Sequence, residues 1–162
     1  MTRPTVTTSR GTVRGVAAHG VDAFLGVPFA RADRFGAPQP APPWEGLRDA
    51  DTAGPAPYQS PPLYAELGAD VGEDCLQLDI WRPSHIDAPL PVLVWIYGGG
   101  FEHGASSVVG TSGRPYAATG RVVVVSLNYL LGPFGWAQLA HLGEPFASSS
   151  NLGLRDQIAA LS

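Results

Sequence analysis

The 162-residue chain contains no lysine and a single cysteine, Cys75. Its 10 basic residues are all arginines, scattered along the chain, and the net charge is −4. This distribution excludes the concentrated basic surface of a nucleic-acid-binding protein. One cysteine cannot form a disulfide within the chain. The longest apolar runs, around Val92–Tyr97 and Val122–Leu127, are too short to span a bilayer.

The first residues, Met1–Gly11, also lack the apolar segment of a secretory signal, which favours a cytoplasmic location. Apolar residues make up 44% of the chain and charged residues 15%. That composition and the length predict one globular domain with a real core over residues 1–162. With 20 glycines and 16 prolines, turns and irregular loops should be plentiful.

The N-terminal part reads as short strands and a long irregular stretch. Val6–Thr8 and Gly11–Gly15 are β-branched runs interrupted by glycine, typical of a β-hairpin, and Val21–Leu25 predicts a third short strand. From Pro28 to Pro62 the sequence is rich in proline, glycine and alanine. We expect an irregular excursion there, with one strand near Leu47–Ala50.

The second half predicts an α/β sheet. Leu76–Trp81 alternates in polarity, as a half-buried strand does. Val92–Tyr97 and Arg121–Leu127 are continuous apolar runs, so we expect both faces of these strands to be buried. A short helix should lie around Pro115–Thr119, between the two runs. Strands separated by helices are typical of an α/β fold.

A final helix is predicted after Asn151, which can cap its first turn. The apolar residues Leu154, Ile158 and Leu161 fall at i, i+4 and i+7. That spacing places them on one side of the helix, and we expect this side to face the core.

The sequence Gly98-Gly99-Gly100 follows directly on the run that ends at Tyr97. Without Cβ atoms, the backbone can take positive φ and present bare N–H groups to a ligand. A phosphate-binding loop usually has a lysine or leads directly into a helix. This chain has no lysine, and the acidic Glu102 beside the glycines disfavours a phosphate. An oxyanion hole fits better. A third interpretation is that the glycines merely turn the chain.

Five segments, taken in order, resemble the type-B carboxylesterase family, whose members have the α/β-hydrolase fold. The family patterns are GIPYA…RF, EDCLxLNxW, PVxVWIHGGGF, VVVxxNYRxGxxGF and GNxGLxDQxxAL. The matching segments are Gly26–Ala30 with Arg34-Phe35, Glu73–Trp81, Pro91–Phe101, Val122–Gly135 and Asn151–Ala160. Single segments of this kind are weak signals, but five in the family's order and spacing are specific.

The resemblance implies the N-terminal part of an α/β-hydrolase: a mixed, mostly parallel central sheet with an N-terminal β-hairpin. It also implies a serine esterase that acts on small-molecule carboxylic esters through an acyl-enzyme, without cofactor or metal. In the family the nucleophilic serine lies in a G-x-S-x-G motif beyond the DQxxAL helix, and the acid and histidine lie further on. Residues 1–162 contain no such motif. We therefore expect an incomplete domain that is inactive by itself.

An alternative on the same fold is a binding or adhesion module without catalysis, since some family members have lost the serine. The next stretch of the gene would discriminate the two, because only an esterase needs G-x-S-x-G. The oligomeric state is not defined by the sequence.

The resemblance carries residue roles as well. Gly99 and Gly100 match the glycines whose N–H groups donate to the oxyanion. Arg34 and Glu73 match a pair that forms a buried salt bridge in relatives and would pin the N-terminal excursion to the sheet. The candidates for lining a pocket are Tyr97, Phe101, Glu102 and His103. The other histidines, His19, His85 and His141, match no catalytic position.

Some positions depart from the family pattern. The stretch Gly54–Gln59 lacks the cysteine that pairs with the equivalent of Cys75 in many relatives, so Cys75 should be a free, buried thiol. Leu130 replaces the arginine of NYR, Ser150 replaces a glycine, and Tyr97 replaces the commoner histidine before the glycines.

Overall fold

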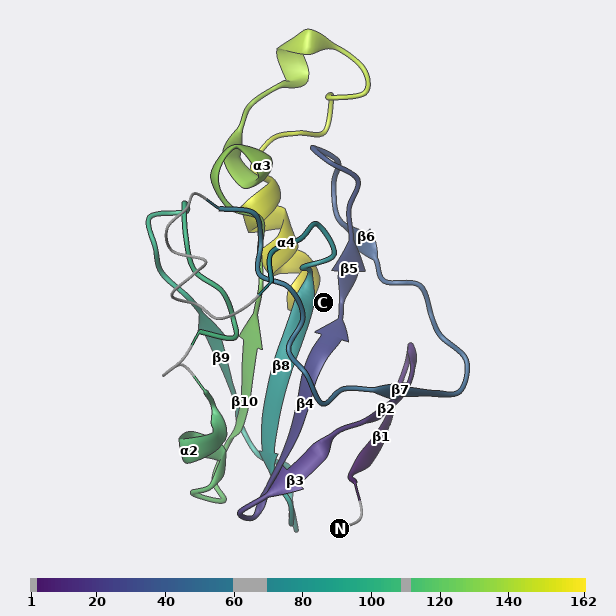
Figure 1. Ribbon diagram of the computed structural model, residues 1–162, viewed down its shortest axis with the longest axis vertical. Helices are drawn as coiled ribbons and strands as arrows, with labels where there is room; N and C mark the ends of the chain where they lie inside the picture. Colours follow the sequence, from purple (N-terminus) through teal and green to yellow (C-terminus); the bar gives the residue numbers. More distant parts are fainter. Residues whose placement is uncertain (1–2, 60–69, 109–111) are drawn as a thin grey trace.

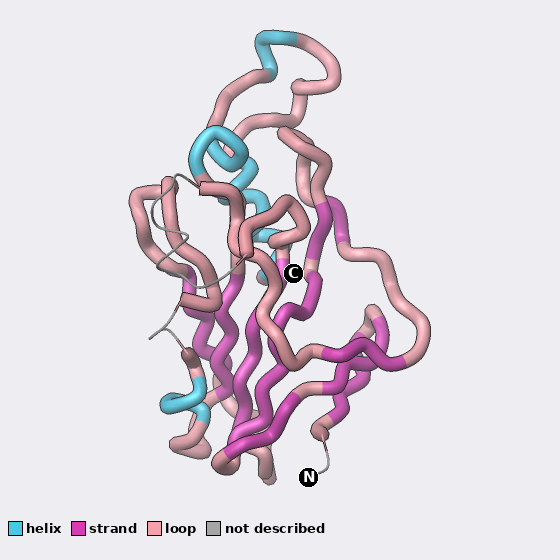
Figure 2. Tube along the Cα trace, viewed as in Figure 1, coloured by secondary structure: helices cyan, strands magenta, loops and turns pink. Residues whose placement is uncertain are grey.

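The structure, a computed structural model, describes residues 3–59, 70–108 and 112–162. Its main sheet has five strands in the spatial order β3, β4, β8, β10, β9 (Figure 1). Their bounds are Val16–Ala18, Val21–Pro28, Gln77–Pro83, Val123–Leu127 and Val92–Ile96, respectively. Figure 2 shows the long loops gathered at the end of this sheet where β9 and β10 end.

The described part of this sheet is mixed but mostly antiparallel, whereas the sequence predicts a mostly parallel one. Only β9 and β10 pair in parallel, with Val94 opposite Val125. The other three pairings are antiparallel. The reason lies in the connections, because parallel neighbours need a crossover. Between β9 and β10 the chain makes one, and it contains the predicted short helix, α2 (Arg114–Ala117).

The predicted N-terminal hairpin is confirmed. Strand β1 (Thr5–Thr8) pairs antiparallel with β2 (Gly11–Arg14). The strand expected near Leu47–Ala50 is β7 (Leu47–Asp49), which lies parallel to β2. The described part of the predicted excursion is otherwise largely irregular, apart from the short pair β5 (Ala30–Arg31) and β6 (Gln39–Pro40), which the sequence did not indicate. Residues 60–62 of that stretch lie outside the described residues.

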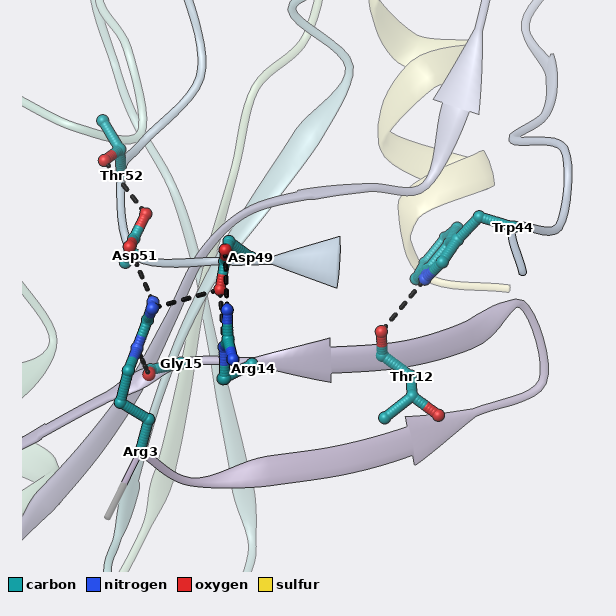
Figure 3. Close-up of polar contacts among 8 residues, drawn as sticks. All are labelled: Arg3, Thr12, Arg14, Gly15, Trp44, Asp49, Asp51 and Thr52. Carbon is teal, nitrogen blue, oxygen red and sulfur yellow. Dashed lines mark hydrogen bonds and ion pairs between the residues drawn. The ribbon is translucent and has the colours of Figure 1, made fainter. Parts of the chain in front are cut away.

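Polar contacts fasten the excursion to the hairpin (Figure 3). Two nitrogens of the Arg14 guanidinium donate to the two carboxylate oxygens of Asp49, at 2.7 and 2.9 Å, and this bonding holds the pKa of Asp49 below its ordinary value. Arg3 joins Asp49 at 3.1 Å and Asp51 at 2.6 Å. The indole N–H of Trp44 donates to the Thr12 carbonyl at 3.0 Å. These contacts hold a segment that has little regular structure of its own.

The predicted strand at Leu76–Trp81 is β8, and its burial alternates as expected. The more buried face is the unexpected one, because it carries Gln77, Asp79 and Trp81, while Leu78 and Ile80 are half-buried. β8 pairs with β4 on one side and with β10 on the other, so both of its edges are hydrogen-bonded within the sheet. The polar side chains tolerate burial because they have hydrogen-bond partners. Gln77 Nε2 donates to the Asp74 carbonyl at 2.8 Å, and the partners of Asp79 are described below.

The continuous apolar run at Val92–Tyr97 forms β9, but its predicted burial is wrong. All five residues of β9 are exposed, from Val94 at 37% to Val92 at 58%. β9 is the outermost strand of the five-stranded sheet (Figure 1). In contrast, Val124 of the neighbouring β10 is only 3% exposed. A continuous apolar run predicts a strand, but it does not show whether that strand lies in the middle or at the edge of the sheet.

The exposed edge strand leads to a test of the isolated chain. We expect residues 1–162 to self-associate and to bind an apolar dye, because long, apolar, unprotected edges promote association. Val94→Lys should reduce both effects and change the free energy of unfolding by less than about 0.5 kcal/mol. Val124→Lys, which buries a charge in the adjacent strand, is the destabilising control. A monomer without dye binding would contradict the expectation; sedimentation velocity and dye fluorescence measure it.

Three helical segments follow β10. They are α3 (Gly132–Trp136), the 3₁₀ helix η1 (Ala140–Leu142) and α4 (Leu152–Ala160). α3 packs against α4, and both lie beyond the end of β10 (Figure 1). The final helix thus exists as predicted.

The predicted cap and buried face of α4 are wrong. Asn151 occupies the N-cap position with φ of 51°, but its side chain makes no capping bond. Leu154, Ile158 and Leu161 are exposed, whereas Leu152, Gly153 and Asp156 are buried. A Cβ on Gly153 would lie 2.6 Å from the Leu130 carbonyl oxygen and 2.9 Å from the Trp136 ring. Only glycine permits this close approach, so the side of α4 that carries Gly153 is the one that packs against Leu130 and Trp136.

Candidate functional site

The glycine loop after β9 has a backbone that only glycine adopts readily. Gly99 has φ of 140° and Gly100 φ of 62°. The Gly99 carbonyl accepts the N–H groups of Glu102 at 3.1 Å and His103 at 3.2 Å, so the loop folds back on itself. A Cβ on Gly99 would overlap the carbonyl oxygen of His103. Phe101, with φ of 64°, continues the left-handed stretch, which is uncommon for a bulky residue.

The N–H groups of Gly99 and Gly100 have no hydrogen-bond acceptor within the described part of the chain. Unpaired backbone donors on a bent glycine loop can bind an oxygen that carries negative charge. Their availability is the geometric feature that the oxyanion interpretation requires.

The entry to the loop is fixed by two tyrosines. Tyr97 and Tyr129 stack with ring centroids 4.6 Å apart. The Tyr97 hydroxyl donates to the Tyr129 carbonyl at 3.1 Å, and the Tyr129 hydroxyl donates to the Tyr97 carbonyl at 2.9 Å. Burial raises the pKa of both phenols, so both stay neutral and keep donating. This reciprocal pair locks the residue before the glycines to the end of β10.

The exit from the loop is held by buried polar side chains. The Ser106 N–H donates to Asn128 Oδ1 at 2.8 Å, and the Ser106 hydroxyl donates to Asp79 Oδ2 at 2.8 Å. Asp79 Oδ1 accepts the N–H of Gly26 at 2.9 Å. Burial raises the pKa of Asp79, against the effect of these bonds. Nothing in the sequence indicates a role for Asp79, which lies in the alternating strand, or for Asn128, which directly follows the apolar run that ends at Leu127.

A hollow of about 530 Å³ lies beside the loop. It is lined by Gly100, Phe101, Glu102, Gly132, Pro133, Trp136 and Ala137. The Phe101 and Trp136 rings are 4.4 Å apart, and the Phe101 carbonyl accepts the Gly132 N–H at 2.7 Å, which ties the glycine loop to α3. Of the four candidates for pocket lining, Phe101 and Glu102 face this hollow. Tyr97 is instead buried, and His103 is exposed but does not line the hollow.

Arg34 and Glu73 do meet, at 2.5 Å. Their side chains are 55% and 47% exposed, so the buried pair expected from relatives is an exposed one here. Such pairs contribute about 0–1 kcal/mol. The Arg34 guanidinium also lies 5.4 Å from the centre of the Phe134 ring of α3. The pair therefore connects the excursion both to the segment before β8 and to α3.

Cys75 is a free, buried thiol, as predicted. Burial, with a further contribution from the Asp156 carboxylate, raises its pKa to about 12, so it stays protonated and unreactive. His85 forms an exposed contact with Asp87 at 3.0 Å. The described residues contain no cluster of three or more His, Cys, Asp or Glu side chains that could hold a metal ion.

A bent glycine loop with free N–H groups, set at the end of a mixed α/β sheet, is typical of α/β-hydrolases. The sequence profile of the Carboxylesterase family matches residues 2–162. The chain belongs to this family.

Individual relatives agree with the family assignment. The chain is 43% identical to the para-nitrobenzyl esterase of Bacillus subtilis (strain 168), over 99% of the chain and 34% of that protein. It is also 43% identical to the acetylcholinesterase of Bungarus fasciatus, over 96% of the chain and 28% of that protein. A solved para-nitrobenzyl esterase structure superimposes with a TM-score of 0.91 at 42% identity, covering 99% of the chain and 34% of its partner.

The chain thus spans about a third of the length of the relatives named above. Among the helices of the described residues, none is long and apolar enough to cross a membrane. The cytoplasmic location expected from the sequence stays a prediction.

Proposed function

We propose that residues 1–162 contribute the oxyanion-binding loop to a serine esterase that hydrolyses small-molecule carboxylic esters through an acyl-enzyme. The observation that carries this proposal is the pair of unpaired N–H groups at Gly99 and Gly100, on a loop fixed at its entry and at its exit. Membership of the carboxylesterase family supports it.

In the proposed mechanism, the two N–H groups bind the carbonyl oxygen of the ester. As a serine attacks the carbonyl carbon, that oxygen gains negative charge, and the two donors stabilise it without reorganising. Collapse of the tetrahedral intermediate expels the alcohol and leaves an acyl-enzyme, which water then hydrolyses. This chain's part is to orient the ester and stabilise the charge.

We further propose that residues 1–162 form the N-terminal portion of a single domain, and that the nucleophile, acid and histidine come from sequence beyond Ser162. The exposed apolar faces of β9 support this proposal, because such strands are usually covered in an α/β sheet. On this account the chain alone has no nucleophile for ester hydrolysis.

A chimera tests the proposed function. Residues 1–160 are joined to the C-terminal part of the para-nitrobenzyl esterase of Bacillus subtilis, which supplies the serine, acid and histidine of that family. We expect the chimera to hydrolyse p-nitrophenyl acetate with saturation kinetics and to be inhibited by a serine-directed phosphonate. The chain of 162 residues, assayed alone, should match the buffer blank. A folded but inactive chimera would favour the non-catalytic binding module instead.

A further inference from the structure

The exit of the glycine loop has a second anchor, contributed by a side chain far away in the sequence. Gln59 Oε1 accepts the N–H of Gly104 at 3.0 Å, and Gln59 Nε2 donates to the Gly104 carbonyl at 2.9 Å. The same nitrogen donates to the Pro57 carbonyl at 3.0 Å. The carboxamide thus pairs with one residue's backbone at both its donor and its acceptor, as a neighbouring β-strand would.

Burial makes this contact specific. Gln59 is only 7% exposed, and losing a hydrogen bond between buried polar groups is costly. Gly104 has φ of 125°, and a Cβ at this position would run into the Tyr97 ring. The Gly104 backbone is therefore confined between that ring and the Gln59 amide.

The position of Gly104 bears directly on the two free N–H groups. The preceding residue, His103, donates its N–H to the Gly99 carbonyl at 3.2 Å. A displacement of Gly104 therefore moves His103 and, through this bond, the Gly99–Gly100 peptide unit, which contains the Gly100 N–H. Ser106 is anchored separately, by Asn128 and Asp79. Of the two anchors at the exit of the loop, Gln59 is thus the nearer to the turn.

We propose that Gln59 is a positioning residue for the oxyanion-binding loop. Its carboxamide fixes Gly104 and so sets the direction of the Gly99 and Gly100 N–H groups. The inference rests on the proposed function. It gives the irregular excursion a part in catalysis: that segment supplies a brace to a loop 45 residues further along the chain.

The test uses the chimera described above. Gln59→Leu keeps the approximate volume of the side chain but removes the hydrogen bonds of its carboxamide to Gly104 and Pro57. We expect kcat for p-nitrophenyl acetate to fall by about 10- to 100-fold, with KM changed less than about twofold, because misplaced donors weaken transition-state binding rather than ground-state binding. The matched control is Gln39→Leu, at an exposed glutamine of the same excursion whose amide donates to the Ala37 carbonyl at 3.5 Å; it should leave both constants unchanged.

A second variant separates positioning from packing. In Gln59→Glu, a neutral carboxyl offers one donor and one acceptor, as the amide does, whereas the carboxylate offers acceptors only and faces the Gly104 carbonyl. The ratio of its kcat to that of the parent chimera should therefore rise as the pH is lowered and the introduced carboxyl takes up a proton. A role in stability alone would lower the melting temperature and leave this ratio flat.

The outcomes are distinguishable. An active parent chimera in which Gln59→Leu keeps kcat within twofold overturns the role of Gln59 and leaves the proposed function standing. A flat pH ratio for Gln59→Glu also overturns it. A folded but inactive parent chimera overturns the proposed function, and the role assigned to Gln59 falls with it.

Discussion

In the chimera, Gly99→Val and Gly100→Val should each lower kcat for p-nitrophenyl acetate by about 10²- to 10³-fold, which corresponds to about 3–4 kcal/mol in the barrier. KM should change far less. In the proposed mechanism the N–H groups of these two glycines bind an oxygen whose charge develops in the transition state, so their misplacement should appear mainly in kcat.

The two substitutions act by different routes. At Gly99 any Cβ would overlap the His103 carbonyl, so the turn must open and both N–H groups shift. At Gly100 the space around a Cβ is open, but φ is 62°, a conformation that costs a non-glycine residue about 1 kcal/mol. Gly100→Ala should therefore keep more activity than Gly100→Val, whereas Gly99→Ala should be nearly as damaging as Gly99→Val.

Gly98 provides the matched control. It precedes the other two in the same loop, no atom lies within 4 Å of a Cβ placed there, and its φ lies outside the left-handed region. Gly98→Ala should leave kcat within about twofold of the parent. Circular dichroism and melting temperature must show that all variants are folded. If the chimera is active and the valine variants keep the parent's kcat, the glycines only turn the chain.

These glycines could be found from sequence because their pattern is local. Three consecutive glycines after an apolar run predict a backbone that approaches a ligand, and the structure shows the positive φ values that glycine permits. The β1–β2 hairpin and helix α2 were equally visible, since each is encoded within a few residues. The family resemblance supplied what local pattern could not, namely the interpretation of Gly99 and Gly100 as oxyanion donors.

The anchors of the loop were not predictable in the same way. Gln59 bonds to backbone atoms of Gly104. Because every residue has the same backbone groups, the sequence around Gly104 contains no side chain that indicates this partner. Burial failed for a related reason. Whether β9 is covered depends on which strand lies beside it, and which side of α4 packs depends on how closely Gly153 lets α3 approach. Both are decided by contacts between distant segments.

Asp156 shows the consequence of that packing for stability. It is fully buried on α4, and its Oδ2 accepts the N–H of Leu130 at 3.0 Å. Its Oδ1 has no hydrogen-bond partner among the described residues. Leu130 stands where the family usually has arginine, so its side chain brings no positive charge to this carboxylate. Burial raises the pKa of Asp156 from 3.8 to about 7, although the Leu130 N–H and the charge of Arg155 oppose the rise.

A raised carboxyl pKa makes folding depend on pH in a defined direction. Between pH 3.8 and about 7 the unfolded chain has lost this proton and the folded chain keeps it. Raising the pH through that window therefore lowers the free energy of unfolding, and above pH 7 the loss stays constant. The difference between the two pKa values corresponds to about 4 kcal/mol at most.

Asp156→Asn in the chimera should remove this dependence, because asparagine still accepts from Leu130 but cannot ionise. Its buried NH₂ group lacks an acceptor, which costs about 1–3 kcal/mol. We therefore expect the variant to be less stable than the parent at pH 4 and more stable at pH 8, by about 1–3 kcal/mol, in urea denaturation. Asp22→Asn is the control: this buried carboxylate is paired with Arg82 at 3.1 Å and with Ser84 at 2.7 Å, so the substitution should destabilise at pH 8. If Asp156→Asn destabilises equally at both pH values, Asp156 is ionised throughout this range and has a partner that compensates its burial.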